Sequence, residues 1–305
     1  MKTQELQEKL LELKKLAEDS GIIIDKEALE IEEKFKSASS LEAVWKKVEL
    51  ARHRDRPYAL DYIERIFDDF VELHGDRLYA DDSSIIGGLG FLDGRPVTIL
   101  ANQKGRSLKE NMERNHGMAN PEGYRKALRL AKQAEKFKRP IISFVDTAGA
   151  YPGLGAEERG IGEAIAHNLR DFSCLQTPII CIIIGEGGSG GALGISVGDR
   201  IYMLQNAIYS VISPEGCASI LLRDPAKSKE AAAMLRITSD DLLHYQIING
   251  IIAEPKEGAH TDYDGVADEI KKVLLRDLKN LCGRHGRALA RYRGQKIRKL
   301  GHWRE

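Results

Sequence analysis

The sequence lacks a long hydrophobic segment and an excess of charge of either sign. Its longest unbroken apolar run is Ile179-Ile180-Cys181-Ile182-Ile183-Ile184, far short of the roughly 20 residues that a membrane-spanning helix needs. Lysine plus arginine and aspartate plus glutamate both number 46, so the formal net charge is zero. The total charge therefore gives no reason to expect a polyanionic partner. We expect a protein that does not enter a membrane.

The sequence also lacks the usual patterns of targeting and metal binding. Its start, MKTQELQEKLLELKKLAEDS, alternates charge with leucine and has no apolar secretory-signal stretch, so we expect a cytoplasmic protein. The chain has four cysteines without a C-x-x-C pair and scattered histidines without H-E-x-x-H. We therefore expect no metal held by this chain. The cysteines are Cys174, Cys181, Cys217 and Cys282.

The pattern of apolar residues divides the 305-residue chain into three parts. Leucines and isoleucines recur at intervals of three and four between Glu5 and Val48, which predicts a helical N-terminal arm over residues 1–55. Arg52 to Arg56 reads as a charged link to a main domain over residues 56–280, and a basic tail follows over residues 281–305. The main domain is predicted to open with a helix over 61–74 that stops at Gly75.

The main domain has the pattern of an α/β sheet protein. Residues 85–92 and 96–101 are β-rich and separated by Asp93-Gly94, which predicts a hairpin. The strands predicted over 141–145 and 178–184 are apolar runs that follow a proline and precede a helix, as in a sheet covered on both faces. The further predicted elements are helices over 156–169 and 240–247 and strands over 208–212 and 251–253. Two more helices are predicted after a cap and a proline: one over 121–136 after Asn120, and one that leads from Ser213-Pro214 into residues 217–222.

Two glycine-rich segments each follow a buried strand and precede a helix. They are Asp146-Thr147-Ala148-Gly149-Ala150-Tyr151-Pro152-Gly153 and Gly185-Glu186-Gly187-Gly188-Ser189-Gly190-Gly191-Ala192. Ligands of α/β sheets bind beyond the carboxyl ends of strands, where glycines let backbone N–H groups approach them. Two such turns side by side would form an oxyanion hole, in which one donor contributes roughly 3 kcal/mol to transition-state stabilisation. The alternative is that residues 187–191 only let a helix pack tightly on the sheet.

The second segment also matches shorter motifs. Residues 187–191 fit G-x-S-x-G, the nucleophile elbow of α/β-hydrolases, with Ser189 as the nucleophile, but no motif identifies a partner histidine. Gly188, Gly190 and Gly194 resemble a dinucleotide-binding loop without its acidic residue about 20 positions later. No P-loop sequence occurs.

The C-terminal tail is strongly basic between Arg284 and Arg304. Such charge runs are usually solvated helix faces. The alternative is a contact for phosphate groups or for an acidic partner, including nucleic acid.

Five long segments occur in a fixed order along the chain: RPYALDYIERIFDDFVELHGDRLYADD, NPEGYRKALRLAKQAEKF, DTAGAYPGLGAEERGIGEAIA, IGEGGSGGALGI and YSVISPEGCASIL. Together they resemble the alpha-subunit family of the acetyl-CoA carboxylase carboxyltransferase, the multi-subunit bacterial and plastid type. The resemblance runs from about Leu50 to His260 and implies a crotonase-like fold of repeated ββα units. It further implies an obligate beta subunit with a zinc ribbon, an assembly of two copies of each chain, a biotin carboxyl carrier protein and a biotin carboxylase.

The family reaction moves a carboxyl group from carboxybiotin to acetyl-CoA and gives malonyl-CoA, the first committed step of fatty acid synthesis. The resemblance implies that backbone amides of Gly190 and Gly191, with Gly149 and Ala150 opposite, form the oxyanion hole for the biotin ureido carbonyl. The enolate of acetyl-CoA would be held mainly by the beta subunit. The residues implied around carboxybiotin are Tyr151, Pro152, Gly153, Gly187, Gly188 and Ser189.

The sequence departs from the family at Ala148, where the family motif reads DTPGAYPG. The missing proline removes a restraint on φ beside the expected donors, although alanine can adopt the same conformation. The chain has no A-M-K-M biotinylation segment, so biotin is expected on a separate carrier. The alternative function is a self-contained acyl-CoA hydrolase or isomerase on the same fold, with Ser189 or Glu186 acting.

Overall fold

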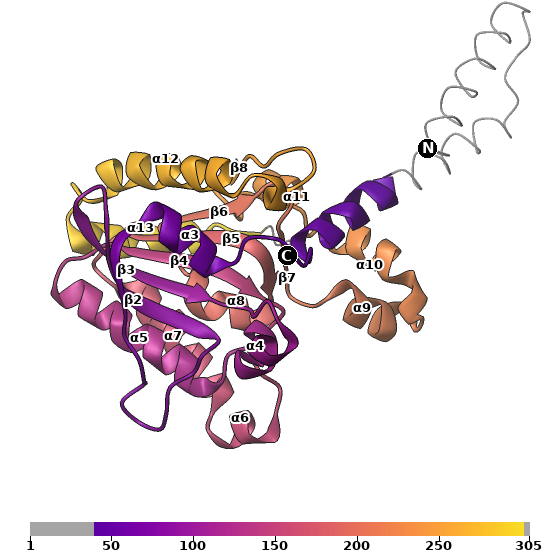
Figure 1. Cartoon of the computed structure of the whole chain (residues 1–305), viewed down its shortest axis with the longest axis horizontal. Helices are drawn as coiled ribbons and strands as arrows, with labels where there is room; N and C mark the ends of the chain where they lie inside the picture. The colour runs from indigo at the N-terminus through magenta and orange to yellow at the C-terminus, as the bar shows by residue number, and fades with distance from the viewer. Residues whose placement is uncertain (1–39, 302–305) are drawn as a thin grey trace, which may run out of the picture.

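A mixed β-sheet forms the centre of the molecule (Figure 1). The computed structural model describes residues 40–301. Most of the predicted N-terminal arm lies outside these residues, and the described part is helical over 40–51. The strands are β1 Asp68–Glu72, β2 Ile85–Leu92, β3 Arg95–Asn102, β4 Ile141–Thr147, β5 Ile179–Gly188, β6 Arg200–Leu204, β7 Ile208–Ser210 and β8 Gly250–Ile252.

The strand order is β1-β2-β3-β4-β5-β6-β8, and β7 pairs with the far end of β5. The first three strands are antiparallel neighbours, and every pair from β3 onwards is parallel. The predicted hairpin over residues 85–101 is confirmed as β2 and β3, joined at Asp93-Gly94. Parallel strands bring their carboxyl ends to one edge of the sheet, so the segments after β3, β4 and β5 become neighbours there.

Helices cover both faces of the sheet. All seven residues of β4 are buried, and neighbouring side chains of this strand face opposite ways. Ser143 donates to Ile195 O of α8 at 2.6 Å, whereas Phe144 packs against Tyr62 and Phe67 at the other face. Thus α8 lies with α5 and α7 on one face, and α3 lies with α12 on the other. The continuous apolar strands follow from this double cover.

The helix that starts at Pro214 begins where the sequence offers both a cap and a proline. Ser213, predicted as a cap before Pro214, accepts the Gly216 N–H at 3.0 Å.

No helix within residues 40–301 combines the length and the apolar character needed to span a membrane. The helices are α3 Ala59–Ile66, α4 Leu108–Glu113, η1 Asn115–Gly117, α5 Pro121–Lys136, α6 Leu154–Glu158, α7 Ile161–Cys174, α8 Ser189–Ser196, α9 Pro214–Cys217, η2 Ala218–Leu222, η3 Pro225–Lys227, α10 Ser228–Leu235, α11 Ser239–His244, η4 Ala259–Thr261, α12 Tyr263–Leu281 and α13 Gly286–Arg298.

The helix predicted over 61–74 is wrong in its second half. The helix α3 ends at Ile66, and β1 pairs with β2 through an irregular register between Asp68 and Val71. A Cβ at Gly88 of β2 would lie 2.3 Å from Val71 O. The glycine of the neighbouring strand therefore admits the β1 backbone, and this tertiary pairing overrides the helical spacing of the apolar residues.

Two other predictions need correction. The helix predicted over 156–169 is two helices, α6 and α7, because Gly160 takes a left-handed conformation with φ +78° between them. The basic tail is not simply a solvated helix end, since Arg293 of α13 is fully buried. Sequence reasoning identified neither β6 nor α12.

Candidate functional site

The first glycine-rich segment leaves the carboxyl end of β4 as a tight turn. Thr147 Oγ1 accepts the Gly149 N–H at 3.1 Å and donates to Gly149 O at 2.7 Å. Tyr151 N donates to Ala119 O at 3.0 Å, which fixes the end of the turn. The Gly149 N–H, expected to serve as a donor, is thus used within the turn, whereas the described contacts assign no acceptor to the Ala150 N–H.

The second segment joins β5 to α8. Ser189 opens the helix with φ +52°, a left-handed conformation that is uncommon outside glycine. The cap residue Gly188 has no side chain with which to satisfy the first turn. The first N–H groups of an α-helix have no partner within it, so Gly190 and Gly191 present free amides at the positive end of the helix dipole.

The structure brings the two segments into backbone contact. A Cβ at Gly191 would lie 2.4 Å from Ala150 N and 2.4 Å from Gly149 C, and a Cβ at Gly188 would lie 2.1 Å from Ala148 O. Such distances are too short for any side chain. The glycines at 188 and 191 are therefore needed for the two turns to touch. Gly191 lies against Gly149 and Ala150, whereas a Cβ at Gly190 would meet only Ile165, at 3.8 Å.

The residues expected around carboxybiotin do not all lie together. Gly187 and Gly188 line a cavity of about 30 Å³ together with Ala148. The ring of Tyr151 instead folds back over Gly153, where a Cβ would lie 2.4 Å from it. The remaining two expected residues, Pro152 and Ser189, do not line this cavity.

A chain of charged groups lies beneath the two turns. Lys104 Nζ contacts Asp146 Oδ1 at 2.6 Å and Glu186 Oε2 at 3.4 Å, and Arg52 Nε donates to Glu186 Oε1 at 2.7 Å. Arg52 also makes a two-pronged pair with Glu215 at 2.7 and 3.3 Å. Asp146 belongs to the first turn and Glu186 to the second, so Lys104 joins the turns electrostatically.

These contacts keep Glu186 ionised. Burial alone would raise the pKa of its carboxyl group, but Lys104 and Arg52 hold that pKa below the ordinary value. The pKa of Lys104 is raised because the attraction of Asp146 and Glu186 exceeds the effect of burial. With both oxygens occupied and a low pKa, Glu186 is a poor general base.

Sequence reasoning missed Lys104 and treated Arg52 only as part of a link. The signal for Lys104 was its position two residues beyond β3, at the same sheet edge as both turns. The contact between Arg52 and Glu186 spans 134 positions and has no short motif.

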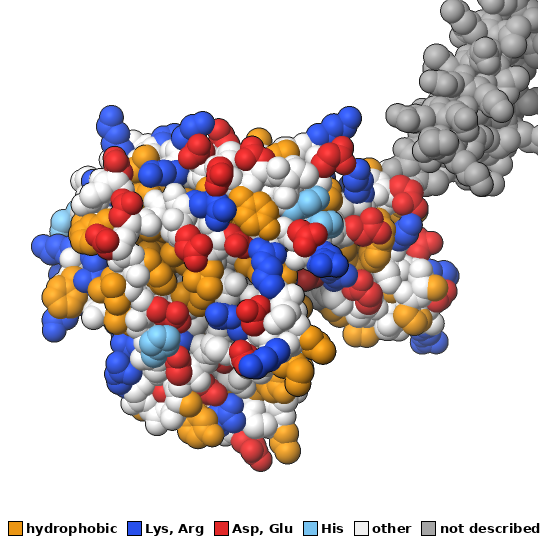
Figure 2. Space-filling model, viewed as in Figure 1, with side chains coloured by type: hydrophobic (Ala, Val, Ile, Leu, Met, Phe, Trp, Pro, Cys, Tyr) orange, Lys and Arg blue, Asp and Glu red, His pale blue; other side chains and the backbone are white. Residues whose placement is uncertain are grey.

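Large apolar side chains are exposed around this end of the molecule. Leu108, Leu154 and Val211 are each at least 75% exposed, and Ile220 and Leu221 of η2 are 67% and 69% exposed. Figure 2 shows apolar side chains at the lower edge, around α4 and α6, and on the lobe that carries α9 and α10. Groups of exposed apolar residues beside a ligand site mark a surface for another protein.

Comparison with known proteins places this geometry in context. A family model described as acetyl co-enzyme A carboxylase carboxyltransferase-like matches residues 1–301. A relative from Treponema denticola, named acetyl-coenzyme A carboxylase carboxyl transferase subunit alpha, is 64% identical over 293 residues, which cover 96% of each chain. A relative of the same name from Oceanobacillus iheyensis is 51% identical over 302 residues, covering 97% of this chain and 95% of the relative.

The similar solved structures share the fold. Transcarboxylase 12S, with methylmalonyl-coenzyme A and methylmalonic acid bound, superposes with a TM-score of 0.60 at 21% identity, over 74% of this chain and 41% of that chain. A chain of a Pseudomonas malonate decarboxylase hetero-tetramer in complex with coenzyme A gives a TM-score of 0.58 at 19% identity, over 72% of this chain and 89% of that chain. The predicted α/β crotonase-like fold is thereby confirmed.

Proposed function

The chain belongs to the family of acetyl-CoA carboxylase carboxyltransferase alpha subunits, enzyme subunits that make malonyl-CoA, and from this premise we propose that its two touching turns are the electrostatic centre of carboxyl transfer. The observation that carries the proposal is the backbone contact of Gly191 with Gly149 and Ala150. This contact brings Ala150 of one turn beside the start of α8, which carries Gly190 and Gly191.

Backbone amides suit this reaction. Carboxybiotin, when bound, supplies the carboxyl group, and its ureido carbonyl needs donors as negative charge develops on it. The N–H groups of Gly190, Gly191 and Ala150 are fixed in place before the reaction, so they stabilise that charge without rearranging. Glycine at 188 and 191 lets the backbones of the two turns approach each other, because a Cβ at either position would collide with the facing turn. No side-chain nucleophile is required.

The charged chain beneath the turns has a positioning role in this proposal. Lys104 holds Asp146 and Glu186, one from each turn, at 2.6 and 3.4 Å. The N–H of Glu186 also donates to Asp146 Oδ1 at 2.9 Å. In this proposal these bonds hold the ends of β4 and β5 together, so the backbone N–H groups of the two turns that follow keep their orientation.

A second chain would complete the site. The cavity beside the turns, at about 30 Å³, is much smaller than the roughly 300–1,000 Å³ of ordinary ligand pockets. The exposed apolar rim on α4, α6 and η2 offers a partner surface. We assign this surface to the beta subunit, with its zinc ribbon and its share of the acyl-CoA pocket, in an assembly of two copies of each chain.

The wider assembly follows from the same family resemblance. We propose that the biotin is delivered by a separate carrier protein and recharged by a biotin carboxylase, and that acetyl-CoA and malonyl-CoA are substrate and product of the joint site. We place this assembly in the cytoplasm, in keeping with the first committed step of fatty acid synthesis. We also propose that the chain divides into a helical arm over residues 1–55, a carboxyltransferase domain over 56–280 and a basic tail over 281–305.

Gly191→Ala tests the role of the touching turns. Its methyl group would collide with the backbone of Gly149 and Ala150, so we expect a loss of roughly 10²–10³-fold in carboxyl transfer, the cost of one misplaced oxyanion donor. The measurement is transfer from malonyl-CoA to a biotin derivative, with the chain co-purified with its carboxyltransferase partner.

Gly162→Ala is the matched control, because a Cβ there meets nothing within 4 Å on the exposed side of α7. Circular dichroism establishes that both variants are folded. A folded Gly191→Ala protein with unchanged transfer would overturn the proposed site.

A further inference from the structure

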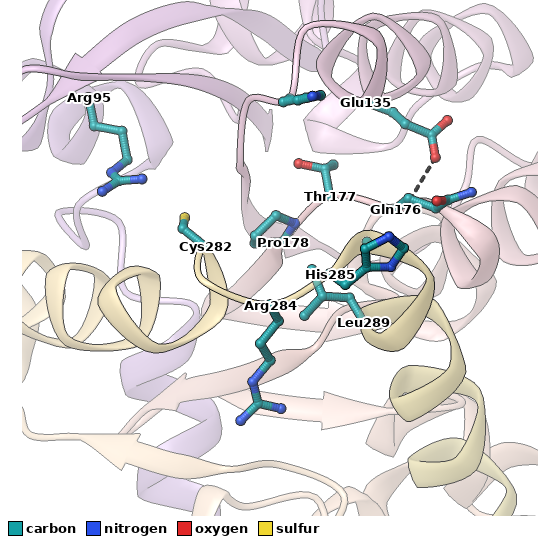
Figure 3. Close-up of a pocket in the computed structure, with 11 residues that line it drawn as sticks. Arg95, Glu135, Gln176, Thr177, Pro178, Cys282, Arg284, His285 and Leu289 are labelled. Atoms are coloured by element: carbon teal, nitrogen blue, oxygen red, sulfur yellow. Dashed lines mark hydrogen bonds between the residues drawn. The ribbon is translucent and has the colours of Figure 1, made fainter.

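A pocket of about 620 Å³ lies at the opposite end of the sheet from the two glycine-rich turns (Figure 3). Arg95 at the start of β3, the segments before β4 and β5, and the joint between α12 and α13 form its walls. The turns follow the carboxyl ends of β4 and β5, whereas this pocket precedes their amino ends. The seven residues of β4 separate the two places by roughly 20 Å.

Basic side chains dominate the charge of this pocket. Arg95, Lys138, Arg284 and His285 line it, and all four are exposed. Within residues 40–301 the first three make no ion pair with a carboxylate; Arg284 instead lies over the ring of Tyr292 at 5.7 Å. The lining includes one acidic side chain, Glu135, whose carboxylate accepts the Gln176 N–H at 2.7 Å, as Figure 3 shows.

A helix start adds to the positive charge. Helix α13 is 13 residues long and begins at the pocket wall, and its cap residue His285 makes no side-chain hydrogen bond to the first turn. Gly286 brings this turn close to the neighbouring loop, since a Cβ there would lie 2.5 Å from Gln176 O. The carbonyls that end α7 nearby already accept from Arg293, so they do not offset the positive end of α13.

We propose that this pocket is a second ligand site, distinct from the carboxyl-transfer site, and that it binds a phosphate-bearing small molecule. Its volume lies within the range of ligand pockets. Arginine, lysine and a helix N-terminus are the groups that recognise phosphate oxygens. Pro178 and Leu289 also line the wall, and both are buried.

The test is binding of pyrophosphate and of ATP to the chain co-purified with its carboxyltransferase partner, measured by calorimetry. The variant is Arg95→Gln with Lys138→Gly. Lys138 has φ +55°, a conformation that glycine adopts more easily, so this change removes a cation without straining the fold. We expect the dissociation constant of the tighter probe to rise about tenfold or more, while carboxyl transfer without probe stays unchanged.

Lys256→Gln, an exposed cation outside the pocket, is the control and should bind both probes as the unaltered chain does. Tighter binding of ATP would identify a nucleotide, and equal binding of the two probes would identify the phosphate group itself as the ligand. Absence of saturable binding of both probes, or equal weakening by Lys256→Gln, would overturn the second site and leave the proposed carboxyl-transfer site untouched.

Discussion

At the scale of single residues, the proposed site depends on two glycines that lack a side chain and on a pair of largely buried charged side chains. Gly188 and Gly191 matter because a Cβ at either position would meet backbone atoms within 2.4 Å. Glu186 and Lys104 matter because each neutralises the other. The sequence predicted the glycines through their placement after strands, but it could not predict Lys104, whose role appears only when three strand ends meet.

Ser189 distinguishes amide catalysis from nucleophilic catalysis. It has the left-handed backbone and strand-to-helix setting of a nucleophile elbow, yet within residues 40–301 its hydroxyl makes no hydrogen bond to a histidine. We expect Ser189→Ala to keep most of its carboxyl-transfer activity. A nucleophilic serine would instead show a loss on the order of 10⁶-fold, and CoA-thioester hydrolysis by the chain alone would then have to be measured.

Asp81 should govern part of the stability in acid. Burial alone would raise the pKa of its carboxyl group, but Lys126, the Gly75 N–H and His74 lower that pKa to about 2. A carboxyl group whose pKa is lowered by folding stabilises the protein above its ordinary pKa, near 4, and this contribution is lost as the pH falls from about 4 to about 2.

We expect Asp81→Asn to lower the free energy of unfolding at pH 7 and to flatten its dependence on pH between 4 and 2. Urea denaturation at several pH values measures this. Asp268→Asn, an exposed change on α12, provides the comparison. An equally steep acid dependence in Asp81→Asn would show that other carboxylates are responsible.

At the scale of elements, α13 shows how one side chain fastens a helix to the sheet. Arg293 is buried and donates to both oxygens of Asp199 at 3.1 and 2.8 Å. It also donates to Phe172 O, Leu175 O and Thr177 O at 2.6–3.0 Å. All five N–H groups of the guanidinium are thus used, and the helix caps both the end of α7 and the start of β5.

Arg293→Leu should therefore lower the free energy of unfolding by about 3–5 kcal/mol, because it leaves the buried Asp199 carboxylate without its partner. Urea denaturation followed by circular dichroism gives the value. Arg287→Leu on the exposed side of the same helix should change it little. A similar small effect of both substitutions would mean that α13 contributes little to the core.

Helices and strands were predicted correctly where neighbouring residues determine the structure. They were predicted wrongly where contacts between distant residues determine it. The hairpin at Asp93-Gly94 and the helices that begin after Asn120 and Ser213 were predicted because turn, cap and proline residues act over a few positions. Residues of β1 were predicted to be helical because their pairing as a strand depends on Gly88 in another strand. The basic residues of α13 resembled a solvated face because Asp199, the partner of Arg293, lies 94 positions earlier.

At the scale of the whole molecule, the proposed function requires that this chain supply part of a site and that a partner complete it. The turns lie at an open edge of the sheet beside a cavity of about 30 Å³, and the apolar rim around them is exposed. The family resemblance in the sequence predicted this dependence on a partner. The pocket at the other end of the sheet had no sequence signal, since its basic residues come from three separate segments.

Leu221→Lys tests the rim as a partner surface. Leu221 is 69% exposed on η2, and a charge in an apolar interface costs several kcal/mol unless it is paired. We expect this variant to fold but to lose co-purification with the carboxyltransferase partner, and to lose transfer in parallel. The control is Val71→Lys on β1, where the side chain is 59% exposed; this variant should keep both co-purification and carboxyl transfer. Normal co-purification of Leu221→Lys would mean that the partner binds elsewhere.

The pairing of Arg293 with Asp199 also has a consequence for how the protein is made. Because 94 positions separate the two residues, the ribosome needs roughly 5–20 s after adding the aspartate before it adds the arginine. During that interval Asp199 has no arginine partner, and closing the sheet around it would bury an unpaired charge. Completion of the core around Asp199 is therefore expected late in synthesis of the chain.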